Sequence, residues 1–133
     1  MKNILVVDDE KDVLLILEKI LTAKGYSVIT ATNGTNAIAL AKSQHPDLII
    51  LDIVMPGMDG GEVSAKLQEH PLTRSIPVIF LTALLTKREE YQEKYTINSN
   101  IIFAKPIDTE ELLAQIEELL CNERPRKRIR CWF

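Results

Sequence analysis

The chain has 133 residues, of which 46% are hydrophobic and 26% are charged. This composition lets a single domain bury a core without metal or disulfide help, and it excludes disorder for most of the chain. Cys121 and Cys131 are too few for a disulfide framework or a zinc site. No segment approaches the ~20 apolar residues of a membrane span, and the N-terminus lacks a signal-peptide layout, so we expect a cytoplasmic location.

Charge is distributed unevenly along the chain. Residues 122–133 have a net charge of +4 while the whole chain has −3, so residues 1–121 carry −7. An acidic body argues against direct nucleic-acid binding by the domain. We expect the basic tail to be a linker or a disordered chain end. The alternative is a patch for an acidic partner or a membrane surface, anchored by Trp132 and Phe133.

Five strands, each followed by a helix, are predicted in chain order. Short apolar runs rich in β-branched residues are typical of strands in a parallel sheet that is covered on both faces. We predict these strands at residues 4–7, about 26–31, 48–51, 76–81 and 101–104.

The segments between these runs show the helical spacing of apolar residues. The first helix should end at Lys24-Gly25, and the second before Pro46. The fourth, about 84–95, has little apolar surface and should be the least stable. Asp108 or Thr109 should cap the last one. The predicted inward-facing residues are Val13, Leu14, Leu17, Ile20 and Leu21, then Ala37, Ile38, Leu40 and Ala41, then Val63 and Leu67, and finally Leu112, Leu113, Ile116, Leu119 and Leu120.

Alternating strands and helices with right-handed crossovers predict a flavodoxin-like, doubly wound α/β fold. Its five-stranded parallel sheet would have the strand order 2-1-3-4-5 and would be accompanied by five helices. The domain should span residues 1–121. Such sheets bind ligands outside the carboxyl ends of the strands, where the strand order reverses, and here that point lies between the first and third strands.

Chemically active side chains follow four of the five predicted strands. Asp8 and Asp9 follow the first, Asp52 the third, Thr82 the fourth and Lys105 the fifth. A single Asp after a strand is more often a turn or cap residue, and a single Lys is usually a solvated surface residue. Their joint occurrence at the strand ends nevertheless favours one shared site.

Three neighbouring acids would repel one another without a cation, so this cluster predicts a bound Mg²⁺. Asp9 and Asp52 would supply carboxylates, Asp8 would hold a metal-bound water, and the backbone carbonyl near Val54 would be a further ligand. A carboxylate can also attack phosphorus to form an acyl phosphate. That reaction needs a metal, a second cation and a hydroxyl donor, which the lysine and the threonine at the other strand ends provide.

Several motifs together resemble the receiver domain of two-component response regulators, in order and spacing, over about residues 2–121. They are Val6-Val7-Asp8-Asp9-Glu10, Pro46-Asp47-Leu48-Ile49-Ile50-Leu51-Asp52, Met55-Pro56-Gly57-Met58-Asp59-Gly60, Leu81-Thr82-Ala83 and Ala104-Lys105-Pro106.

The resemblance implies a role for each residue of the predicted site. Asp52 would be the phosphoacceptor, with Asp8 and Asp9 as the acidic pair around Mg²⁺. Thr82 would be the switch hydroxyl and Lys105 the phosphate-pairing lysine. The sequence departs from the family three residues before this lysine: it has Ile102 where the family usually has an aromatic residue.

We therefore expect a phosphorylation-activated signalling switch. It would accept a phosphoryl group on Asp52 from a histidine kinase or a histidine phosphotransfer protein. It would not be an enzyme acting on other molecules, because it would catalyse only its own phosphoryl transfer and slow autodephosphorylation. The face formed by residues 84–121 would contact a downstream protein target, and this face would also suit a homodimer.

Two other functional classes compete with this expectation. A metal-dependent phosphatase with an aspartyl nucleophile typically has a second Asp two residues later, where this chain has Val54. A constitutive binding domain would keep the fold without phosphorylation. The complete set of acids, threonine and lysine speaks against that class, and Ile102 is its only support.

Overall fold

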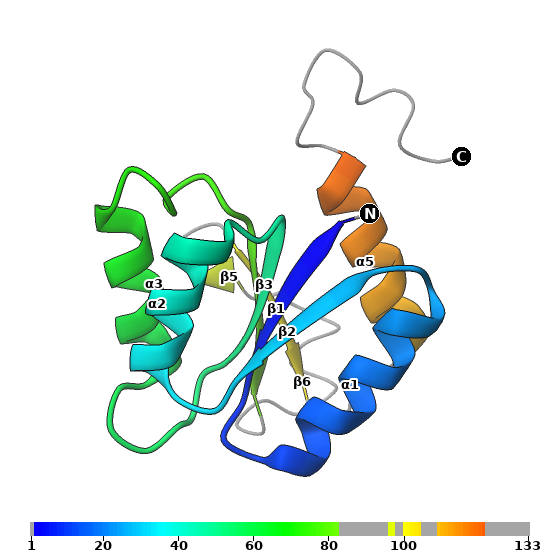
Figure 1. Cartoon of the computed structure of the whole chain (residues 1–133). Helices are drawn as coiled ribbons and strands as arrows, with labels where there is room; N and C mark the ends of the chain where they lie inside the picture. The colour runs from blue at the N-terminus through cyan, green and yellow to red at the C-terminus, as the bar shows by residue number, and fades with distance from the viewer. Residues whose placement is uncertain (1, 83–95, 98–99, 105–108, 122–133) are drawn as a thin grey trace.

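The computed structural model describes the backbone of residues 2–82, 96–97, 100–104 and 109–121, with side chains within 2–81 and 109–120. The predicted helix at 84–95, Lys105 and the basic tail at 122–133 lie outside these residues. In chain order the elements are β1 (Asn3–Val7), α1 (Lys11–Ala23), β2 (Ser27–Ala31), α2 (Gly34–Gln44), β3 (Leu48–Asp52), α3 (Gly60–Glu69), β4 (Val78–Thr82), β5 (Thr96–Ile97), β6 (Asn100–Ala104) and α5 (Thr109–Cys121) (Figure 1).

The strands form one sheet with the order β2-β1-β3-β4-β6-β5. The neighbouring strands in the series β2-β1-β3-β4-β6 all pair in parallel, and this is the strand order predicted for a flavodoxin-like fold. The prediction of a five-stranded sheet was wrong, because β5 adds a short antiparallel strand beside β6. Its two residues, Thr96 and Ile97, are β-branched and suit a strand, but two residues give no periodic pattern to detect.

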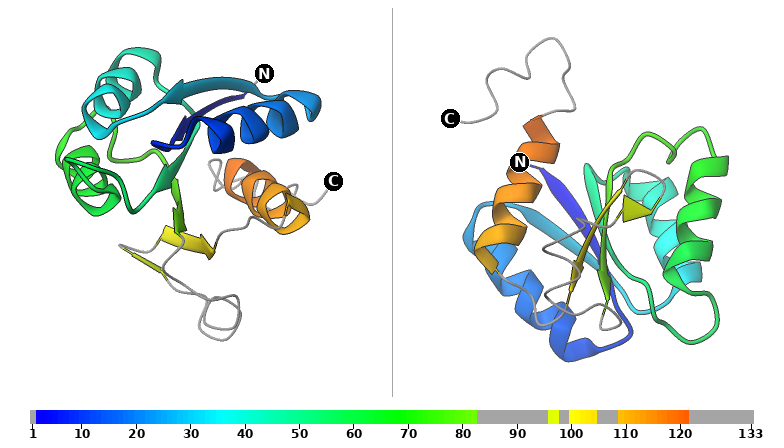
Figure 2. Two further views of the ribbon diagram at one scale, coloured as in Figure 1. Left: turned by 90° about the horizontal axis from the view of Figure 1, so that it is seen from below. Right: turned by 180° about the vertical axis from the view of Figure 1, so that it is seen from behind.

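Helices cover both faces of the sheet, with α1 and α5 on one face and α2 and α3 on the other (Figures 1 and 2). Successive β1 residues alternate between two buried clusters. Ile4 and Val6 pack in the cluster that includes α1 and α5 residues, whereas Leu5 and Val7 pack with α2 and α3. Full burial of one such side chain contributes about 1.5–3 kcal/mol, so these two cores hold the ends of β1 and β3 in place.

The inward-facing residues predicted for the helices are buried or partly buried. In α1 the fully packed positions are Leu14, Leu17 and Leu21, which recur at three- and four-residue spacing. The helix stops as predicted, since Gly25 adopts a φ of 93° that favours glycine. Leu112, Ile116 and Leu120 are buried in α5, while Leu113 and Leu119 are partly buried against the same cluster.

The start of β4 was predicted two residues too early. Pro77 has no N–H to donate to the sheet, and the Ile76 amide donates to the Thr73 carbonyl at 3.1 Å in a turn. The strand therefore begins at Val78 and extends to Thr82. Among the described residues, none of the helices has the length and apolar character needed to cross a membrane.

Candidate functional site

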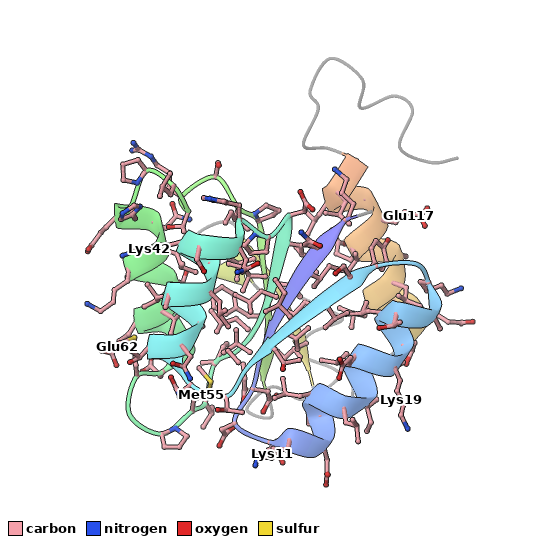
Figure 3. The ribbon with its side chains drawn as sticks, in the orientation of Figure 1. Lys11, Lys19, Lys42, Met55, Glu62 and Glu117 are labelled. Atoms are coloured by element: carbon pink, nitrogen blue, oxygen red, sulfur yellow. The ribbon has the colours of Figure 1, made fainter. Side chains whose placement is uncertain are left out.

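The predicted acidic residues meet at the carboxyl ends of β1 and β3. Val7 and Leu51 are partners in the parallel register of these strands, so Asp8 and Asp52 come next on each side. One carboxylate oxygen each from Asp8, Asp9 and Asp52 lies within 4.8 Å of the other two. Figure 3 labels Lys11 and Met55 at this end of the molecule, where α1 begins and the loop after β3 starts.

The three acids differ in exposure. Asp8 is fully buried and Asp52 is 3% exposed, whereas Asp9 is exposed to solvent. Burial makes each charged form of Asp8 and Asp52 costly unless a counter-charge or hydrogen bonds compensate it. Asp9 faces the solvent side of the cluster and leaves an approach to it open.

Backbone amides orient the two buried carboxylates. Asp8 Oδ1 accepts a hydrogen bond from the Glu10 amide at 2.9 Å, and Asp52 Oδ1 accepts one from the Val54 amide at 3.3 Å. The Asp8 amide itself donates to the Ala31 carbonyl of β2 at 3.1 Å. Since Glu10 is the N-cap residue of α1, Asp8 links the end of β1 to the start of that helix.

Thr82 is the last residue of β4, and its backbone pairs with Ala104 at the end of β6. Asp52 pairs with Leu81, the residue before Thr82. The backbone of Thr82 therefore lies at the same edge of the sheet as the acids. Lys105, next in sequence after Ala104, lies outside the described residues, and its predicted role stays a prediction.

Asp59 and Gly60, where the loop after β3 meets α3, belong to a motif quoted above but had no predicted role of their own. Asp59 caps α3: its side chain accepts from the Glu62 amide, and the Glu62 side chain accepts from the Asp59 amide. Asp59-Gly60-Gly61-Glu62 has the spacing of a capping box, which could have revealed the start of this helix. Gly60 follows directly, and its amide donates to the Ile53 carbonyl at 2.8 Å.

The donor set fits a hard divalent cation. Three carboxylates supply only oxygen ligands, as Mg²⁺ prefers, and one of them is exposed enough to leave room for water ligands. A cation would also relieve the repulsion among three acids, two of which are buried. Asp8, Asp9 and Asp52 are the residues that would hold it.

Comparisons with known proteins establish the class. Residues 4–117 match the sequence pattern of the response regulator receiver domain family, and the chain belongs to this family. It is a receiver domain of the two-component response regulators, and its fold is the flavodoxin-like α/β fold of its structural neighbours.

Three similar proteins illustrate this relationship. Response regulator PleD of Caulobacter vibrioides is 44% identical over 117 residues, which are 88% of this chain and 26% of PleD. The alkaline phosphatase synthesis transcriptional regulatory protein PhoP of Bacillus subtilis is 36% identical over 121 residues, which are 90% of this chain and 48% of PhoP. The chain therefore spans between about a quarter and a half of these two relatives.

The third is a solved structure, the receiver domain of the sensor histidine kinase PA1611 from Pseudomonas aeruginosa PAO1. It matches with a TM-score of 0.75 and 27% identity, over 90% of this chain and 97% of that one. That structure has a magnesium ion coordinated in its active site cleft.

Proposed function

We propose that this domain accepts a phosphoryl group on Asp52 in a Mg²⁺-dependent reaction and thereby switches a signalling surface. The main observation behind this proposal is that oxygen atoms of three carboxylates lie within 4.8 Å of one another, at the point where the strand order of the sheet reverses. Asp52 is the last residue of β3, and Asp8 and Asp9 directly follow the neighbouring strand β1. This arrangement offers one nucleophilic carboxylate and two acids for the cation.

The reaction would move a phosphoryl group from a phosphohistidine donor to the Asp52 carboxylate. The phosphorus–nitrogen bond of the donor breaks, a phosphorus–oxygen bond to an Asp52 Oδ atom forms, and the histidine leaves with the electron pair. Mg²⁺ would neutralise charge on the phosphoryl oxygens. The Val54 amide holds Asp52 Oδ1 at 3.3 Å and so fixes the orientation of the carboxylate.

The remaining roles in this proposal follow the family resemblance. Thr82 would supply the switch hydroxyl, Lys105 would pair with the phosphoryl group, and the Val54 backbone carbonyl would complete the metal ligands. A fifth helix at 84–95 would complete the fold. The domain would act only on itself and would lose its phosphoryl group slowly.

The partners belong to the proposal as well. A histidine kinase or a histidine phosphotransfer protein would supply the phosphoryl group in the cytoplasm. A downstream protein would read the surface that includes α5, and a homodimer could form through the same surface. Support comes from the receiver family itself, whose members named above include a transcriptional regulatory protein.

Intact mass after incubation with acetyl phosphate and Mg²⁺ tests the proposal. We expect one added phosphoryl group on the wild-type protein, none without Mg²⁺ and none on Asp52→Asn. Turnover of acetyl phosphate without an adduct would indicate a phosphatase instead. No reaction at all would leave a constitutive binding domain. Equal labelling of Asp52→Asn would place the acceptor elsewhere.

A further inference from the structure

Gly60, the first residue of α3, lies against the backbone of the phosphoacceptor strand. A Cβ atom at this position would be 2.5 Å from the Asp52 carbonyl oxygen and 2.7 Å from Ile53 Cα. Ordinary contacts between carbon atoms are about 3.5–4.0 Å, so the approach to Ile53 Cα is too short, and the approach to the Asp52 oxygen is too short for a carbon and an oxygen atom as well. The atoms in the way belong to the main chain and cannot rotate aside as a flexible side chain would.

Backbone conformation does not explain this glycine. Among the described glycines, positive φ angles occur at Gly25 and Gly57, and Gly60 is not one of them. Alanine is more favourable than glycine in helices, so helix preference does not explain Gly60 either. Close approach to the end of β3 is therefore the reason that the position has no side chain.

The segment that Gly60 contacts is fixed from two sides. The Ile53 amide donates to the Leu81 carbonyl of β4 at 2.9 Å, and the Ile53 carbonyl accepts from the Gly60 amide at 2.8 Å. The backbone from Asp52 to Val54 thus lies between β4 and the start of α3. A side chain at position 60 would displace this segment or force α3 away from it.

We propose that Gly60 is a positioning residue for the Asp52 carboxylate and its Mg²⁺ site. The Asp52 side chain is attached to the backbone that Gly60 contacts, and Asp52 Oδ1 is oriented by the hydrogen bond from the Val54 amide. A shift of this segment moves one carboxylate relative to Asp8 and Asp9, which β1 holds separately. The inference rests on the proposed metal-dependent phosphorylation of Asp52.

The chain provides two matched controls for Gly60→Ala. Gly61→Ala adds a methyl group to the next residue of the same helix, where the nearest atom is the side-chain atom Asp59 Oδ1 at 3.3 Å. Gly34→Ala creates a comparable clash, 2.7 Å from Val63 Cγ2, at the start of α2 and against side chains rather than against Asp52. The first controls for helix preference and the second for a general loss of packing.

Calorimetric Mg²⁺ titration and urea unfolding would be measured for the three variants and the wild type, with adduct formation from acetyl phosphate as a second readout. We expect Gly60→Ala to weaken Mg²⁺ binding by about tenfold or more, as changes to residues that orient metal ligands do. Gly34→Ala should lose stability but keep its Mg²⁺ affinity within about twofold, because the atoms it would displace belong to the side chains of Val63 and Met58 and not to the Asp52 backbone. Gly61→Ala should keep its Mg²⁺ affinity, and any change in its stability measures the helix preference of alanine together with the contact with Asp59 Oδ1.

The outcomes distinguish a failure of the positioning role of Gly60 from a failure of the proposed Mg²⁺-dependent phosphorylation. A wild-type protein that binds no Mg²⁺ would refute the proposed function. A wild type that binds Mg²⁺ together with a Gly60→Ala variant of unchanged affinity would refute only the positioning role. Equal losses of affinity in Gly34→Ala and Gly60→Ala would also refute it. Gly60→Ala is also made in a Ser64→Ala background, which should be more stable because the buried Ser64 hydroxyl has no hydrogen-bond partner among the described residues. Unfolding of Gly60→Ala in both backgrounds would overturn the proposal in favour of a purely structural role.

Discussion

Asp8 and Asp9 are neighbours in sequence but lie in opposite environments: Asp8 is fully buried and Asp9 is exposed. Both nevertheless bring a carboxylate oxygen within 4.8 Å of Asp52. The pair therefore joins a buried carboxylate to a solvent-accessible one. This difference decides which acid can be altered without disturbing the core.

Asp9→Asn should separate metal binding from folding. It removes one charge from three crowded carboxylates, so the metal-free protein should melt at the same or a slightly higher temperature. The stabilisation that millimolar Mg²⁺ gives the wild type by binding the native state should be lost. Thermal melts with and without Mg²⁺ measure both effects, with Asp12→Asn in the first turn of α1 as the control. An Mg²⁺ shift that persists in Asp9→Asn would remove Asp9 from the ligand set.

Ser64→Ala should stabilise the domain. Ser64 is fully buried in α3, and its hydroxyl has no hydrogen-bond partner among the described residues. Removing an unsatisfied buried hydroxyl from a helix, and replacing serine by a better helix former, should add about 1 kcal/mol to the free energy of unfolding. Urea denaturation measures this change. Ser43→Ala on the exposed side of α2 is the matched control and should have a smaller effect; a destabilised Ser64→Ala would show that the hydroxyl has a partner.

Asp59→Ala should destabilise the start of α3. The Asp59 carboxylate accepts from the Glu62 amide at 2.9 Å and completes a reciprocal cap with the Glu62 side chain. Loss of such a cap typically costs about 1 kcal/mol. Asp59→Asn keeps an acceptor at the same place and should retain most of the stability in chemical denaturation. If the alanine and asparagine variants unfold alike, the charge of Asp59 rather than its hydrogen bond is responsible.

The phosphoryl group on Asp52 should be lost slowly rather than within seconds, because the residues two positions after Asp52 and two positions after Thr82 are apolar and cannot orient the attacking water. Val54, two residues after Asp52, is apolar and 50% exposed. Leu84, two residues after Thr82, is also apolar and lies outside the described residues. The Val54→Asn/Leu84→Glu double variant should lose its adduct faster at neutral pH with Mg²⁺. A wild-type adduct that disappears within seconds would contradict the argument.

The residues of the acidic cluster were predictable because parallel strands end at one edge of a sheet. Asp8 and Asp52 each follow an unbroken apolar run, and a run of that kind fixes where its strand ends. The order of the parallel strands followed from the alternation of strands and helices. These inferences depend on patterns within single segments, and such patterns are visible in a sequence.

The role of Gly60 was not predictable in the same way. A glycine at the start of a helix has many explanations, and the contact that requires it joins two segments eight residues apart through main-chain atoms. The short strand β5 was missed for a related reason, since Thr96 and Ile97 form a strand only by pairing with β6. Both features depend on three-dimensional proximity rather than on local pattern.

The hydrogen bonds at the opposite end of β1 and β3 limit how these strands can change length. The Asn3 amide donates to Asp47 Oδ2 and the Asp47 amide donates to the Asn3 carbonyl, each at 2.8 Å. From this clamp to the acidic cluster, both strands advance five residues, to Asp8 and to Asp52. One residue gained or lost in either strand would move its acid by about 3.3 Å and turn the side chain to the other face. Related sequences should therefore tolerate insertions in the loops but keep both five-residue intervals constant.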